Sequence, residues 1–151
     1  MRNTKILLPL VFICFACYRY KPAPRDFNFE YIQYHHIIST FDSIYVPRYY
    51  NTQKKVYRLV LTNIEKDKIY NMMVKIDLFS FPEKVSEPDT SSTSIFLPHI
   101  DSLKVLANRK VYKFYWGSLV LPQAQELYKL ENNIKRLIME KKEFRNLPLP
   151  R

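Results

Sequence analysis

The stretch Ser102-Leu-Lys-Val-Leu-Ala-Asn-Arg-Lys-Val-Tyr-Lys-Phe-Tyr-Trp116 contains two runs of β-branched, aromatic and other apolar residues around a two-residue break. Such runs are typical of strands, and a break of two residues is the length of a tight hairpin turn. We therefore expect antiparallel strands at 102–107 and 110–116 joined by Asn108-Arg109, with Arg109 where such turns favour glycine. Three aromatic side chains fall on one face of the second strand: Tyr112, Phe114 and Trp116.

A helix is expected on each side of this hairpin in the sequence. Thr62-Asn-Ile-Glu65 matches a capping box, in which the first and last side chains satisfy each other's main-chain N–H groups. An apolar stripe at helical spacing follows and closes near Leu78; it comprises Ile69, Met72, Met73 and Ile76. The second helix is predicted over 122–144, and its stripe comprises Leu127, Leu130, Ile134, Leu137 and Ile138.

The remaining strands are predicted from shorter patterns. Val56-Tyr-Arg-Leu-Val-Leu61 alternates and reads as a strand, and Phe27-Asn-Phe-Glu-Tyr31 alternates over five residues. A further strand is considered across Ser43 to Tyr50. Strands, helix, hairpin and helix in this order indicate a two-layer α+β domain: an antiparallel sheet of four to five strands with two helices packed on one face.

The N-terminus is expected to be an export signal. Arg2 and Lys5 precede an unbroken apolar run, Ile6 to Ala16, that ends in a small residue. This run is about half the roughly 20 residues that a membrane-spanning helix needs, so a permanent span is the poorer interpretation. We predict a signal peptide at 1–16, a tether at 17–25 and a single small domain at 26–151.

Ile13-Cys14-Phe15-Ala16-Cys17 resembles the lipobox of bacterial lipoproteins, in which a small residue precedes the cysteine that is lipidated. The resemblance implies that Cys17 becomes the mature N-terminus and carries several acyl chains on a thioether. The order of elements over 54–150 also resembles small uncharacterised lipoproteins of the Bacteroidota, and this likeness implies no activity. Because Tyr18 rather than Asp follows the cysteine, the resemblance implies an outer-membrane anchor with the domain facing the periplasm. The alternative is an unmodified Cys17.

The charge balance suggests which partners to expect. The chain has 24 Lys and Arg against 14 Asp and Glu, a net charge of +10. In an exported protein this balance favours anionic headgroups or glycans over nucleic acid, which is scarce in that compartment. The alternative is that the cations, which are spread along the chain, lie on solvated faces of helices and strands. Oligomeric state stays open.

Several catalytic chemistries are excluded by the residues that the chain lacks. Gly117 is its only glycine, so phosphate-cradling, dinucleotide-binding and Gly-x-Ser-x-Gly motifs cannot form. No cofactor or metal is expected. Adjacent His35 and His36 point to opposite faces of an extended strand, and these two and His99 are expected at the surface or a strand edge.

One segment has the composition of a binding site. Tyr45-Val-Pro-Arg-Tyr-Tyr-Asn51 gathers three tyrosines and an arginine around a proline. Tyr and Arg are enriched at interaction hot spots, so we select four candidate binding residues; they are Tyr45, Arg48, Tyr49 and Tyr50. The alternative is that these tyrosines pack at the edge of the core.

Three classes of function follow from these observations. The favoured one is a lipid-anchored envelope protein without catalysis, which meets another protein or a glycan through the tyrosine-rich segment or a free sheet edge. The second is an immunity or inhibitor lipoprotein against a toxin or hydrolase. The third is a small hydrolase using carboxylates such as Glu30, Asp42 and Asp101, whose spacing follows no catalytic pattern. No residue is assigned a catalytic role.

Overall fold

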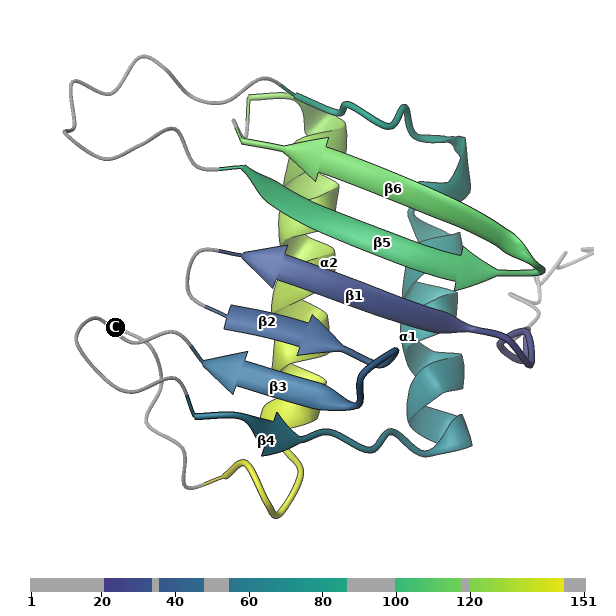
Figure 1. Ribbon diagram of the computed structural model, residues 1–151. Coiled ribbons are helices and arrows are strands. Elements are labelled where there is room, and N and C mark those ends of the chain that lie inside the picture. Colours follow the sequence, from purple (N-terminus) through teal and green to yellow (C-terminus); the bar gives the residue numbers. More distant parts are fainter. Residues whose placement is uncertain (1–20, 34–35, 48–54, 87–99, 118–119, 146–151) are drawn as a thin grey trace, which may run out of the picture.

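The computed structural model describes residues 21–33, 36–47, 55–86, 100–117 and 120–145. Within these residues one antiparallel sheet of six strands is covered on one face by two helices (Figure 1). The predicted two-layer α+β fold is therefore confirmed, although the sheet has six strands rather than four to five.

The first strand along the chain lies inside the sheet, and the strands have the order β4-β3-β2-β1-β5-β6. Their bounds are β1 (Asn28–Gln33), β2 (His36–Ser39), β3 (Ile44–Pro47), β4 (Tyr57–Arg58), β5 (Asp101–Ala107) and β6 (Lys110–Trp116). In the register of the sheet, Tyr31 of β1 lies opposite Ile38 on one side and Leu103 on the other. Each named strand pair is antiparallel.

The difference in strand count comes from β2. Its sequence, His36-Ile-Ile-Ser39, has no clean alternation, and both Ile38 and Ser39 are buried although they lie on opposite faces. The strand expected over 56–61 shrinks to the two residues of β4. Beyond β4 the predicted burial pattern nevertheless holds, because Leu59 and Leu61 are buried while Val60 is exposed.

Both helices form where the periodicity predicts them. They are α1 (Asn63–Lys75) and α2 (Pro122–Met139), and the short 3₁₀ helix η1 (Leu78–Ser80) follows α1. The capping box is confirmed, because the Glu65 N–H donates to Thr62 Oγ1 over 3.2 Å and the Thr62 N–H donates to Glu65 Oε2 over 2.7 Å. Both helices end before the predicted Leu78 and Phe144.

The core lies between the sheet and the two helices. Its largest fully buried side chains are aromatic: Trp116, Tyr31, Tyr45, Phe27, Phe29, Phe114 and Phe144. Along β6, Phe114 and Trp116 are buried and Tyr112 is half-buried, so the predicted aromatic face points to the helices. Phe144, beyond the end of α2, packs edge-on against Tyr45 with 5.5 Å between ring centroids.

The turn between β5 and β6 forms without glycine. Asn108 and Arg109 have φ values of 53° and 63°, the left-handed conformation that two-residue hairpins require. The carboxylate of Asp26 accepts hydrogen bonds from the main-chain N–H groups of both residues. These bonds, the one from Arg109 above all, lower the pKa of Asp26. The turn is thus held from outside by a residue distant in sequence.

The segment that leads into β1 is fixed against α1. The Lys21 N–H donates to Asn71 Oδ1 over 3.0 Å, and the Ala23 N–H donates to Asp67 Oδ1 over 2.8 Å. Asn71 Nδ2 donates in return to the Lys21 carbonyl over 2.6 Å. The last residues of the predicted tether, from Lys21 on, are therefore bound to the side of the helix.

Replacing Arg109 by glycine is expected to stabilise the protein by about 0.5–1 kcal/mol, because a residue with a Cβ is strained in the left-handed region and glycine is not. Chemical denaturation measures the change. Arg109→Ala is the control, since it removes the charge but keeps the Cβ, and it should give no gain. Equal stabilisation by both variants would show that the charge of Arg109, and not its backbone strain, lowers the stability of the wild type.

Candidate functional site

The structure describes one of the four predicted binding residues. Tyr45 is 1% exposed and lies in the core between Tyr57 and His36, with ring centroids 6.5 and 6.4 Å away. For Tyr45 the structure therefore agrees with the alternative interpretation, in which the tyrosine packs in the core. Arg48, Tyr49, Tyr50 and the predicted lipidation site Cys17 lie outside the described residues, so those predictions stay predictions.

His36 is not at the surface, in contrast to the prediction. It is fully buried at the start of β2, on the face of the sheet that α2 covers. The reason is that β2 lies inside the sheet, between β1 and β3, and the His36 side chain points toward α2, where Glu131 Oε1 lies 3.3 Å from His36 Nε2. His35 and His99 lie outside the described residues.

A buried polar cluster surrounds the carboxylate of Glu131, which is 2% exposed. Glu131 Oε1 lies 3.3 Å from His36 Nε2. The other oxygen, Oε2, accepts hydrogen bonds from Gln33 Nε2 over 2.9 Å and from the Tyr31 hydroxyl over 3.3 Å. Gln33 Nε2 also lies 3.3 Å from Asp101 Oδ2 and so joins the two carboxylates.

Burial and the negative charge of Asp101 raise the pKa of Glu131 to about 7, against the ordinary value of 4.5. Burial also raises the pKa of the Tyr31 hydroxyl. A carboxyl group with such a pKa can hold or release a proton near neutral pH. Both Glu131 and His36 are buried between α2 and the sheet.

The sequence contained a signal for this cluster. Glu131 follows Leu130 and precedes Ile134 on the apolar stripe of α2, so a charged side chain occupies an inward position of the helix. The three carboxylates considered for a hydrolase do not come together. Asp101 belongs to the cluster, Glu30 lies opposite Lys104 on the other face of the sheet, and Asp42 accepts a hydrogen bond from Ser39 Oγ over 2.8 Å.

A second candidate site is the outer edge of β6, which is covered at one end. The Tyr115 N–H donates to the Glu83 carbonyl over 2.8 Å, and the Val85 N–H donates to the Tyr115 carbonyl over 2.9 Å. Because residues of a strand send their main-chain groups alternately to either side, Val111 and Lys113 face the same outer side as Tyr115. Within the described part of the chain, no hydrogen bond reaches them there.

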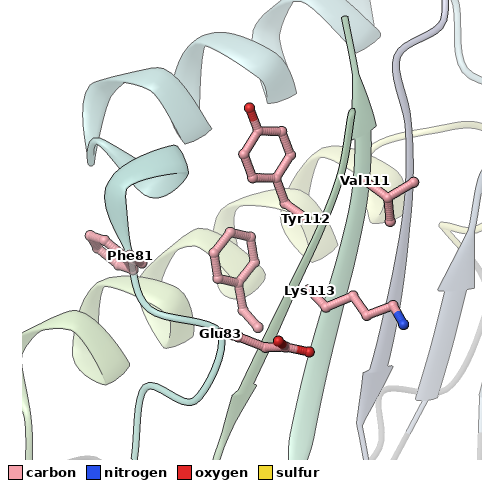
Figure 2. Close-up of a pocket in the computed structure, with 6 residues that line it drawn as sticks. Phe81, Glu83, Val111, Tyr112 and Lys113 are labelled. Carbon is pink, nitrogen blue, oxygen red and sulfur yellow. The ribbon is translucent and has the colours of Figure 1, made fainter. Parts of the chain in front are cut away.

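A hollow of about 380 Å³ lies beside this uncovered stretch. The Phe81 N–H donates to the Leu78 carbonyl at the end of η1, and Phe81 and Glu83 line the hollow across from β6. Figure 2 shows Val111 and Lys113 on one side of β6 and Tyr112 on the other. The residues that line the hollow are Phe81, Glu83, Val111, Tyr112, Lys113 and Phe114.

The surroundings of the hollow are aromatic on the helix side and basic on the open face of the sheet. Tyr112 packs edge-on against Phe79 with 4.9 Å between ring centroids, and Lys110 Nζ lies 4.6 Å from the centre of the Tyr112 ring. On the open face Lys113 lies opposite Lys104 of β5, a pair of like charges. Glu83 is the acidic residue at the rim.

No protein-family model matches this sequence, and no curated protein matches it either. Among the described residues, no helix is long and apolar enough to cross a membrane. The same residues contain no group of three or more His, Cys, Asp or Glu side chains that could hold a metal ion.

Glu131 is expected to make the protein less stable as the pH rises. Between pH 4.5 and about 7 the folded chain keeps the proton that the unfolded chain has lost, so the free energy of unfolding falls across this range. Relative to Glu131→Gln, the wild type should lose about 2–3 kcal/mol between these pH values, as measured by denaturation at each pH.

Glu126→Gln is the matched control, because Glu126 lies on the same helix but is partly exposed beside Lys129. Its pH profile should follow the wild type. If the Glu131→Gln profile also runs parallel to the wild type, the raised pKa of Glu131 is wrong.

Proposed function

We propose that this chain is a lipid-anchored protein of the bacterial envelope that acts by binding another molecule, without catalysis and without a cofactor. The observation that carries the binding function is the outer edge of β6, where main-chain groups face a hollow lined by three aromatic side chains, a valine, a lysine and a glutamate. An edge of this kind is the usual site at which a sheet recruits another polypeptide.

The anchor in this proposal is Cys17, and an outer-membrane location facing the periplasm follows from the lipobox resemblance. Several acyl chains on one cysteine give durable attachment, whereas a single chain holds a protein only marginally. Cys17 precedes Lys21 by four positions, which span at most about 14 Å of extended chain. Since Lys21 is bonded to α1, the anchor would hold the domain close to the bilayer.

The buried position of the polar cluster supports the non-catalytic part of this proposal. Glu131 and His36 have the chemistry of an acid–base pair, but they are 2% and 0% exposed. Their neighbours Tyr31 and Gln33 come from the central strand, so the cluster joins α2 to the sheet. The proposal therefore assigns no catalytic residue.

Cys17→Ala is expected to abolish membrane attachment. Intact mass of the protein extracted from the membrane fraction should equal residues 17–151 plus acyl chains in the wild type. The variant should lack that species and leave the membrane fraction. Cys14→Ala is the control, because Cys14 lies within the predicted signal peptide and its loss should leave the acylated product unchanged.

Two results would contradict the proposed anchor. One is a wild-type mass without acyl chains, and the other is a Cys17→Ala protein that partitions into the membrane as the wild type does.

A further inference from the structure

We propose that the uncovered part of the β6 edge binds an extended, acidic segment of another protein by strand addition. The inference rests on the binding function proposed above and names the chemistry of the partner. It concerns the main chain of Val111 and Lys113 and the hollow beside them.

The main chain supplies the attraction. Val111 and Lys113 each direct one N–H and one C=O outward, so an added strand finds two donors and two acceptors in the spacing of a β-ladder. The same edge already holds an extended segment at its other end, where Glu83 and Val85 bond to Tyr115. Strand addition continues this pairing toward the hairpin turn, along the side of the hollow.

The side chains of the edge define which residues the added strand carries. Successive side chains of an extended segment point to opposite faces of the sheet. Those on the helix side would enter the hollow beside Phe81 and Tyr112, so apolar side chains fit there. Those on the open face would lie beside Val111, which is 50% exposed, and Lys113. Acidic side chains fit there.

Charge favours the acidic partner over a second copy of this chain. Lys104 of β5 already lies opposite Glu30 of β1, so Lys113 is the cation that an added strand would meet, and a carboxylate beside Lys113 offsets its repulsion with Lys104. Glu83 is the exception, because its carbonyl bonds to Tyr115 on the same edge and it lines the hollow at the end of the added segment. Two-fold pairing of β6 with its own copy would bring like charges of a chain with net charge +10 together.

The first experiment uses the full chain, purified in detergent, and two blocked peptides, Val-Glu-Val-Glu-Val and Val-Lys-Val-Lys-Val. Amide NMR is expected to show binding of the Glu peptide, with the largest shifts and slowed hydrogen exchange at Val111 and Lys113. The Lys peptide should bind more weakly by roughly tenfold or more, because it meets Lys113 with like charge.

The second experiment removes one main-chain donor. Lys113→Pro eliminates the outward N–H while leaving the bonds to β5 in place, and an edge strand tolerates proline at such a position. It should weaken binding of the Glu peptide by roughly tenfold. Lys113→Gln removes only the charge and should cost less. Lys66→Gln, on α1, is the control and should bind as the wild type does.

A third probe keeps the inference testable if Lys113→Pro does not fold. The Glu peptide methylated on every main-chain nitrogen has lost its donors toward β6 in either direction of pairing, and the wild type should bind it more weakly by roughly tenfold. The inference is overturned by equal affinity for the methylated and unmethylated peptides, by equal affinity for the Lys peptide, by shifts centred away from β6, or by no binding at millimolar peptide. None of these outcomes changes the mass measured for the acylated protein. The strand-addition proposal can therefore fail while the proposed lipid anchor at Cys17 stands.

Discussion

The fold depends on how α2 lies across the covered face of the sheet. Its buried stripe is apolar except at Glu131, and the carboxylate of Glu131 is met there by Tyr31, Gln33 and His36 from β1 and β2. Apolar packing alone would tolerate a shift of the helix by one turn, whereas a buried carboxylate that loses its partners is costly. Glu131 therefore fixes the position of α2 on the strands.

The parts of this fold that the sequence predicted are those whose signal is local. The capping box at Thr62, the stripes of both helices and the hairpin all follow from patterns within a few residues. Strand β2 has only four residues without alternation, so its place comes from its neighbours in the sheet. Tyr45 and His36 are buried for the same reason, because partners distant in sequence enclose them. Asp26, which braces a turn 82 residues away, gave no signal at all.

The two edges of the sheet differ in how much main chain they leave available for pairing with another strand. Strand β4 is only two residues long, which leaves little main chain to pair with. Strand β6 has seven residues, and among the described residues the segment through Glu83 and Val85 covers it near Tyr115 alone. Beside the uncovered part of β6, lysines lie on the open face of the sheet. Charged side chains at exposed edges reduce self-association in many proteins. A positively charged edge opposes pairing with another positively charged strand, but it does not oppose pairing with a negatively charged one.

The attachment of the N-terminal segment also determines how the domain would bear mechanical tension. A pull at Lys21 acts first on its two bonds to Asn71 and then on the bond from the Ala23 N–H to Asp67. Beyond them the force reaches β1, which is hydrogen-bonded to β2 on one side and β5 on the other (Figure 1). Tension along that strand is shared by both ladders at once, in shear. Under tension, the N-terminal segment would therefore detach from α1 first, and the hydrogen bonds of β1 to β2 and β5 would then resist further extension.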